Sequence, residues 1–588
     1  MGRPPLVLAV ALLAAACGAS DQVTGNNPPP STGTACAGSG TISLTVNQSA
    51  RVDCSAGTTV TLAGNGASYL VVPNFASGEP LRLTPTQYRI SATGASATAA
   101  VLPVASPAAI SAAIMWTWSE IAAGPRPGAL QASFDAALRS RAARLAGGAR
   151  GRWGTGVASG ARAAVQAGPL PAVGSLRTFH VVSTLDTVNV AFKVVTARLL
   201  YVGTNILLYE DTLAPANGFT PSQVTNFALT FDQVLYPIDA NAFGPPSDVD
   251  QNGRLVMLMT PVVNGLTPRA QCTTQGYVAG FFDGGDLVNR DTTSNGGEVF
   301  YTLVPDPSGL VSCPHTAGNL EDELGATFLH ELQHLINFSQ HVLVRHSSEE
   351  EGWLDEGLSL VAEELGSMYY EQKYPPPSGR SNPAQLFPDS AEGYIGGLLG
   401  TSYDYLRETD TTSLTLHSDD QGGLSWRAGD WLMMHWLGDQ KGTAIYKALD
   451  ESALTGIANI EAQAGQPFTT LFSDFSMALY VDSLTGIPRS QIPAANRFTT
   501  RNLRQLYARL FTISGPSGGV PFAFPIQPVP LSSAGTAASL VPGSMAFYRL
   551  NASSSASTVT ITWATPSGSP LPLALRPQLS IYRLPPGT

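Results

Sequence analysis

Two histidines and the glutamate between them are the residues of this chain best suited to chemistry. The segment reads His330-Glu331-Leu332-Gln333-His334. Residues four positions apart lie on one face of an α-helix, so His330 and His334 can bind one metal ion from the same side. Glu331 lies next to them and is suited to accept a proton from a water molecule held by that ion. The spacing therefore predicts a zinc site (Zn²⁺) with Glu331 as the catalytic general base.

A catalytic zinc ion needs a third protein ligand and keeps one position open for water. The best candidate is Glu356, in the segment Trp353-Leu354-Asp355-Glu356-Gly357, which begins a second apolar pattern of helical spacing. Asp355 is an alternative ligand, but it points to a different face of that helix. His341 lies about 10 Å beyond His334 at the rise of an α-helix and cannot reach the same ion. Glu356 is therefore the predicted third ligand.

The helix that carries the histidines is expected to begin at Asn319, because asparagine caps helices well. An apolar stripe of helical spacing runs along it: Leu324, Phe328, Leu332, Leu335 and Ile336. At about 100° per residue, His330 and His334 lie on the opposite side of the helix, so they are not explained as core residues. The run Glu349-Glu350-Glu351 is expected to be a solvated group of charges.

The two motif segments together resemble the gluzincin group of metallopeptidases, in which the third metal ligand is a glutamate on the following helix. Trp353–Gly357 is similar to the Trp-Leu-Asn-Glu-Gly segment of aminopeptidase relatives. Residues 180–500 resemble the hyicolysin family of secreted bacterial neutral metallopeptidases, also through Ser247–Arg254, Gly296–Tyr301 and Leu471–Phe475. The resemblance implies a zincin-like catalytic domain that cleaves proteins or peptides. The exopeptidase motif of the aminopeptidase relatives is not recognised, which favours endopeptidase action.

A second metal site is suggested by Asp248-x-Asp250-x-Asn252-Gly253, which resembles the start of a calcium-binding loop. The predicted ligands of this Ca²⁺ ion are Asp248, Asp250 and Asn252. An EF-hand would need a glutamate at position 259, where the chain has Met259. A solvated turn closed by the Asp and Asn side chains is the alternative.

The 588 residues are too many for one core and suggest several domains. The predicted order is a signal peptide (1–16), a flexible linker (17–40), a β-sandwich module (41–105), a helical and Gly-rich linker or propeptide (106–175), a metallopeptidase domain (176–515) and a second β-sandwich module (520–588). Strands precede helices in the metallopeptidase domain, which predicts an α+β fold. A helix is expected near 129–146. Residues 17–175 fit an inhibitory leader and an accessory domain equally well.

The first residues are typical of an export signal, with Arg3 ahead of a short apolar run at Leu6–Ala16. Leu13–Gly18 is similar to a bacterial lipobox, which makes Cys17 a candidate for lipidation. A plain signal peptide with a chance cysteine is the alternative. The predicted location is an exported lipoprotein of the outer membrane or cell surface, and otherwise a secreted protein.

Four further cysteines, an even number in an exported chain, predict disulfide bonds. They are Cys36, Cys54, Cys272 and Cys313. The local pairing of Cys36 with Cys54 and of Cys272 with Cys313 is favoured, although sequence cannot prove the connectivity.

The net charge of −11 gives no support for nucleic-acid binding. Contact with a membrane is expected only through the lipid anchor, and the chain is expected to be a monomer. Two other functions remain open: an adhesin-like surface protein with a relic metal site, and a zinc hydrolase of non-peptide substrates. The intact Glu331 argues against the relic site, because such sites often lose their base.

Overall fold

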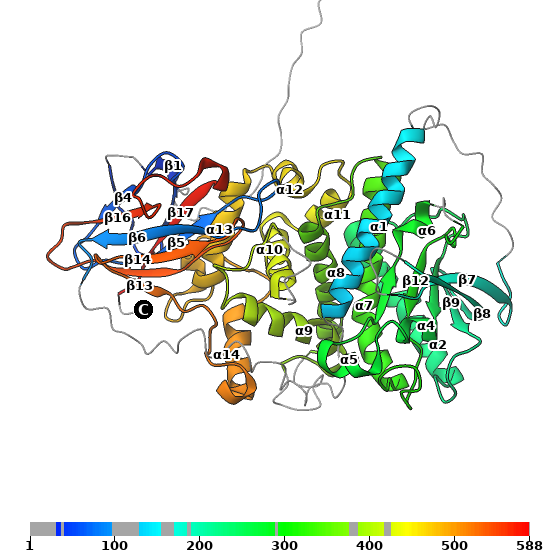
Figure 1. Cartoon of the computed structure of the whole chain (residues 1–588). Helices are drawn as coiled ribbons and strands as arrows, with labels where there is room; N and C mark the ends of the chain where they lie inside the picture. Colours follow the sequence, from blue (N-terminus) through cyan, green and yellow to red (C-terminus); the bar gives the residue numbers. More distant parts are fainter. Residues whose placement is uncertain are drawn as a thin grey trace, which may run out of the picture.

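The computed structural model describes residues 31–36, 40–96, 129–153, 170–184, 190–288, 292–375, 386–416 and 425–586. The predicted signal peptide and Cys17 lie outside these ranges. Figure 1 shows a β-sandwich at one end of the molecule, helices in the middle and a mixed sheet at the other end. The chain is thus a mixed α+β protein, as the sequence predicts.

The sandwich contains strands from both ends of the described chain. They are β1 (Ser31–Ala35), β2 (Thr41–Ile42), β3 (Ser49–Asp53), β4 (Thr59–Ala63), β5 (Ser68–Phe75), β6 (Thr86–Thr93), β13 (Val529–Leu531), β14 (Thr536–Leu540), β15 (Tyr548–Asn551), β16 (Thr558–Ala564) and β17 (Pro577–Leu584). One sheet has the order β1-β3-β17-β5-β15-β13, and the other has the order β14-β6-β16-β4-β2. Buried residues alternate with exposed ones along β16, so that Val559, Ile561 and Trp563 enter the core between the sheets.

This pairing joins two of the predicted domains into one. Separate modules were expected at 41–105 and 520–588, but β17 lies between β3 and β5, and β16 lies between β4 and β6. The interleaving gives a partner to strand edges that either half alone would leave open. The predicted linker at 17–40 also ends earlier than expected, because β1 pairs in parallel with β3.

The second body of the protein is built on a six-stranded sheet. Its strands are β7 (Leu176–Val182), β8 (Phe192–Val202), β9 (Ile206–Asp211), β10 (Leu255–Met259), β11 (Gly280–Phe282) and β12 (Val299–Thr302), in the order β11-β12-β10-β9-β8-β7. Strand β10 is parallel to both of its neighbours, and every residue of β10 and β12 is buried. Strand β11 runs antiparallel to β12 and forms one edge of the sheet.

Helices surround this sheet and connect it to the sandwich. They are α1 (Ala129–Trp153), α2 (Pro221–Thr230), α3 (Tyr236–Phe243), α4 (Pro261–Asn264), α5 (Arg269–Gln275), α6 (Gly284–Val288), α7 (Ala317–Phe338), α8 (Gly352–Lys373), α9 (Asp389–Tyr405), α10 (Ser425–Lys441), α11 (Ala444–Asp450), α12 (Gly456–Ala464), α13 (Phe468–Val481) and α14 (Leu503–Ser514). The helix expected near 129–146 is α1, and the helical stretch expected after residue 319 is α7 to α14.

Helix α7 begins at Ala317, two residues earlier than predicted. Thr316 rather than Asn319 is its cap, since the Thr316 hydroxyl accepts a hydrogen bond from the backbone N–H of Asn319 (3.2 Å). The ring of Phe328 packs edge-on against Phe300 of β12, with centroids 5.5 Å apart. The predicted apolar stripe thus faces the sheet, and the histidines of α7 face α8.

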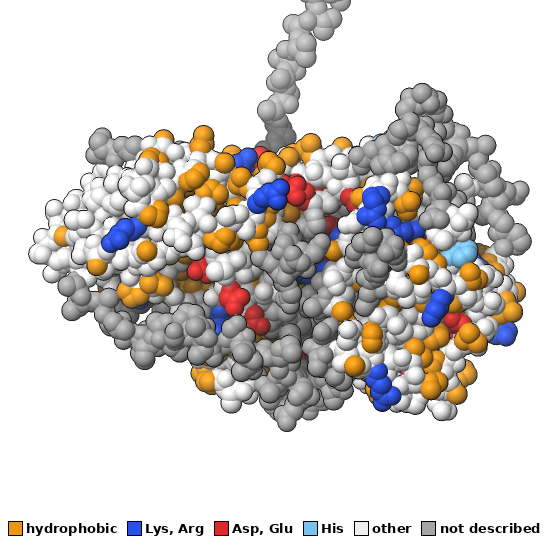
Figure 2. All heavy atoms as spheres, viewed as in Figure 1, with side chains coloured by type: hydrophobic (Ala, Val, Ile, Leu, Met, Phe, Trp, Pro, Cys, Tyr) orange, Lys and Arg blue, Asp and Glu red, His pale blue; other side chains and the backbone are white. Residues whose placement is uncertain are grey.

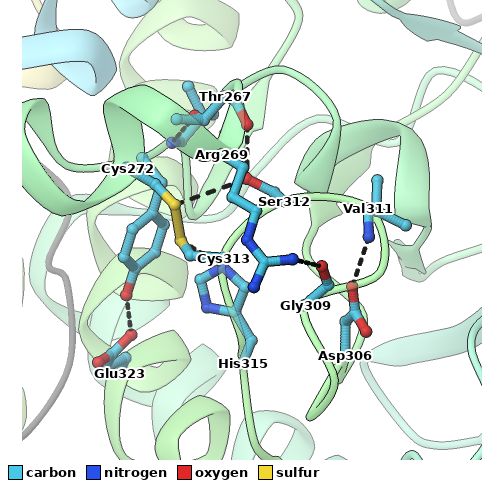
Figure 3. Close-up of a disulfide and its surroundings, with 12 residues drawn as sticks. Thr267, Arg269, Cys272, Asp306, Gly309, Val311, Ser312, Cys313, His315 and Glu323 are labelled. Atoms are coloured by element: carbon cyan, nitrogen blue, oxygen red, sulfur yellow. Dashed lines mark hydrogen bonds between the residues drawn. A yellow bond between two sulfur atoms is a disulfide. The ribbon is translucent and has the colours of Figure 1, made fainter.

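Two disulfides join Cys36 to Cys54 and Cys272 to Cys313, the pairing that the sequence favours. Figure 3 shows the second disulfide, which ties α5 to the loop ahead of α7. Arg269 of α5 donates a hydrogen bond to the carbonyl of Gly309 in that loop (2.9 Å). The Tyr277 hydroxyl donates to the carboxylate of Glu323, inside α7. The approach to α7 is therefore held by covalent and polar contacts.

The described surface is mixed in character. Figure 2 shows apolar and charged side chains interspersed on one face, with the Lys and Arg groups separate from one another. Among the helices that the structure describes, none combines the length and the apolar character that crossing a bilayer requires.

Candidate metal centre

Helices α7 and α8 pack together and bring three predicted ligands to one point. His330, His334 and Glu356 each offer a ligand atom, and these atoms all lie within 4.8 Å of one another. The two imidazole Nε2 atoms are 3.1 Å apart, and His330 Nε2 is 3.4 Å from Glu356 Oε2. All three side chains are buried. Two imidazoles and one carboxylate are a donor set that suits a divalent transition metal.

The outer nitrogen of each histidine is held by a carboxylate. His330 Nδ1 lies 2.8 Å from Glu363 Oε1, and His334 Nδ1 lies 2.9 Å from Asp355 Oδ2. The Ser359 hydroxyl lies 3.0 Å from His334 Nδ1. Contacts of this kind fix the ring orientation and leave the Nε2 atoms directed at the shared point. Asp355, considered from the sequence as a rival ligand, thus contacts the far side of a histidine.

The carboxylate of Glu356 lies between two guanidinium groups. Arg139 Nη1 is 2.5 Å from Oε1, and Arg427 Nη1 is 2.8 Å from Oε2. Burial opposes the charge of Glu356, but Arg427 and Arg139 outweigh it and hold the pKa of this carboxyl well below its usual range. Burial also opposes charge on His330, yet the Glu356 and Glu363 carboxylates raise the pKa of His330 well above its usual value. Glu356 is therefore held as the carboxylate, the form that binds a metal ion.

Glu331 is buried beside this group. Its Oε2 accepts a hydrogen bond from the backbone N–H of Phe282, at the end of edge strand β11 (3.0 Å). Burial first, and then the nearby carboxylate of Asp135, raise the pKa of Glu331 well above its usual value. A raised carboxyl pKa and a fixed orientation are the properties that a general base needs.

Sequence reasoning missed several residues that contact the centre. Arg139, Asp135, Glu363 and Arg427 were not singled out, because each approaches through tertiary packing. Glu363 alone carried a usable signal, since it follows Glu356 by two helical turns and so shares its face.

Three other expectations can be compared with the structure. Glu350 is not solvated: it is buried and accepts hydrogen bonds from the Gly456 N–H (2.6 Å) and the Asn459 amide (2.8 Å). His341 is also buried, 3.8 Å from Glu350 rather than near the histidine pair. The sequence also offers His435, with Tyr394, Tyr403 and Tyr405, as a candidate donor to a developing oxyanion. In the structure, His435 lies 2.6 Å from Glu364 in a separate ion cluster.

The predicted calcium loop also forms an acidic cluster. Ligand atoms of Asp248, Asp250 and Glu298 lie within 4.8 Å of one another. Glu298 precedes β12, and its Oε1 accepts a hydrogen bond from the N–H of Val249 (2.9 Å). Its Oε2 is buried, and none of the described residues donates a hydrogen bond to this oxygen. Asn252 is engaged within the loop, because its Oδ1 accepts a hydrogen bond from the Arg254 N–H (2.6 Å).

Comparison with known proteins gives one informative match. The chain is 31% identical over 173 residues to the neutral metalloprotease ShpI of Staphylococcus hyicus. The match covers 29% of this chain and 36% of that protein, so the chain spans about a third of the length of this relative. None of the known protein-family models matches the chain. The partial match supports a relationship to metallopeptidases, and hence a hydrolase that uses a metal ion.

Proposed function

We propose that this protein is an exported zinc-dependent endopeptidase with a zincin-like catalytic domain. The observation that carries the proposal is the convergence of His330, His334 and Glu356 within 4.8 Å, with Glu331 beside them. The partial match to a neutral metalloprotease supports peptides as substrates. The two disulfides favour an oxidising compartment outside the cytoplasm.

Each residue of the centre has a defined part in this proposal. His330, His334 and Glu356 hold the zinc ion, which when bound lowers the pKa of a water molecule and polarises the scissile carbonyl. Glu331 accepts the proton of the attacking water on its carboxylate and delivers it to the leaving amine. The Phe282 N–H holds one oxygen of Glu331, so that the other is free to take the proton.

Metal removal tests the proposal. The purified chain is expected to hold about one zinc ion and to hydrolyse casein. Treatment with a chelator should stop hydrolysis, and added zinc should restore it. Element analysis by mass spectrometry and release of casein peptides are the two measurements. Bound zinc without peptide hydrolysis would instead favour a hydrolase of non-peptide substrates. This outcome should also hold in Arg139→Ala, which removes the contact of α1 with Glu356.

The proposed location at a membrane or cell surface depends on lipidation of Cys17. A lipid on this residue would keep the enzyme at the outer membrane or cell surface after export. Intact-mass measurement of the mature protein tests this, because a diacylglyceryl group adds a defined mass that the Cys17→Ser chain would lack.

We also propose that Ca²⁺ binds at Asp248, Asp250 and Glu298. The buried Oε2 of Glu298, to which no described residue donates a hydrogen bond, supports this, since a buried carboxylate oxygen needs a donor or a cation. Calcium at 100 times its Kd should stabilise the chain by about 2.7 kcal/mol, measured as a shift in thermal unfolding. The shift should vanish in Glu298→Gln and persist in Glu408→Gln, where the residue is exposed. Identical unfolding curves of the unaltered chain with calcium and with chelator would rule the site out.

A further inference from the structure

Helix α1 comes from outside the predicted metallopeptidase domain, yet it reaches the metal centre. Its Arg139 lies 2.5 Å from Oε1 of Glu356, the residue proposed as the third metal ligand. Its Asp135 offers a carboxylate oxygen within 4.8 Å of ligand atoms of His330 and Glu331. In Figure 1, α1 is the cyan helix drawn across α7 and α8. Helix α1 thus places the guanidinium of Arg139 and the carboxylate of Asp135 beside the proposed metal site and the proposed base, where a substrate would have to bind.

The same helix occupies the edge of the sheet. The side-chain amide of Gln131 donates to the carbonyl of Gly280 (2.8 Å) and accepts from the N–H of Ala279 (2.9 Å), at the start of β11. Gln131 thus occupies two backbone groups at the end of the sheet edge that an added peptide strand would approach. At the other end of β11, the Phe282 N–H holds Glu331. An extended peptide along β11 would therefore run toward the base, and Gln131 occupies its place.

Helix α1 is held in place by specific contacts. Arg141 forms a buried ion pair with Asp283, with Nη1 2.6 Å and 2.5 Å from the two carboxylate oxygens. The ring of Phe134 packs edge-on against Phe281 of β11, with centroids 5.0 Å apart. At Gly284 of α6, an added Cβ would come within 2.9 Å of the Ala142 methyl group, so the glycine permits the close approach.

We propose that α1 is a built-in inhibitor, which covers the metal centre and the start of β11 and must leave them before a peptide substrate can bind. This inference rests on the proposed peptidase function. The backbone hydrogen bonds of α1 are internal to the helix. Helix α1 therefore covers the start of β11 without presenting an extended peptide bond to the base.

The fold separates the role of α1 from that of the N-terminal strands. Strands β1 to β6 are interleaved with β13 to β17, so removing everything ahead of residue 175 would break both sheets of the sandwich. The N-terminal strands therefore stay with the enzyme, and among the described elements ahead of residue 175 release concerns α1. Of the two possibilities that the sequence left open for residues 17–175, the strands are accessory and the helix is inhibitory.

The test compares full-length chains that differ only at α1. In Gln131→Ala/Arg139→Ala, the helix loses its bonds to β11 and to Glu356, so α1 is displaced from the metal centre in a larger fraction of chains. Hydrolysis of an internally quenched, unstructured peptide should rise at least about tenfold, because apparent affinity scales with that fraction. Arg144→Ala is the matched control, since this arginine lies on the exposed side of α1.

A binding measurement separates this inference from the peptidase proposal. In a Glu331→Gln background, fluorescence anisotropy of a fluorescein-labelled casein peptide should show at least about tenfold tighter binding when α1 is weakened. Asp283→Asn weakens α1 from its partner side and should act in the same direction, should the double variant fold poorly. Equal binding with intact and weakened α1 would overturn the inhibitor proposal. Tighter binding to weakened α1 with no hydrolysis in any Glu331-containing chain would support it and contradict the peptidase proposal.

Discussion

Replacing Glu331 with glutamine should lower the rate of peptide hydrolysis by about 10²–10⁴-fold, the range for a positioned general base. Glutamine has the shape of glutamate, and its Oε can still accept the hydrogen bond from the Phe282 N–H. It cannot accept the proton of the attacking water. Zinc content should stay unchanged, because Glu331 is not one of the three proposed ligands. The measurements are kcat on a quenched peptide and zinc content by mass spectrometry.

The matched control is Glu321→Gln, the same change on an exposed position of the same helix. It should leave both kcat and zinc content at the values of the unaltered chain. A Glu331→Gln chain that hydrolyses the peptide at its original rate would show that another group takes the proton. Loss of zinc together with activity would mean that Glu331 contributes to metal binding and not only to proton transfer.

The spacing of residues along the sequence was sufficient to predict single helices and the disulfide pairing. The helical repeat that carries His330 and His334 predicted α7 within two residues, and the segment at Glu356 predicted the start of α8. The cap at Thr316 was missed because Asn319, another good capping residue, lies three positions later. The cysteine pairing followed from proximity in the sequence.

Long-range pairing could not be read in the same way. The alternation in β4 and β16 marks each as a strand, but it does not say which strands are neighbours. Two local modules were therefore expected where one sandwich joins the ends of the chain. The same limit applies to α1, because nothing in the spacing of Gln131 and Arg139 shows that they meet β11 and Glu356. Tertiary packing alone decides these contacts.

Replacing Glu356 with glutamine should weaken zinc binding by more than about 100-fold, which exceeds the 10–100-fold cost of losing an outer partner of a metal ligand. Glutamine is preferable to alanine here. Alanine would leave a cavity beside Arg139 and Arg427, whereas glutamine keeps the side-chain volume and an amide oxygen that can accept a hydrogen bond from one guanidinium. Zinc affinity is measured by competition with a colorimetric chelator, and thermal unfolding checks that the variant folds.

Glu363→Gln provides a graded comparison on the same helix. Glu363 contacts His330 Nδ1 at 2.8 Å on the side away from Glu356, so its loss should reorient a ligand without removing one. Zinc binding should therefore weaken by about 10–100-fold, less than in Glu356→Gln. If the two variants lost affinity equally, Glu356 would act only by orienting a histidine. If Glu356→Gln kept the original affinity, the third ligand would have to come from another residue, and Asp135 on α1 would be the next candidate, because its carboxylate lies within 4.8 Å of His330.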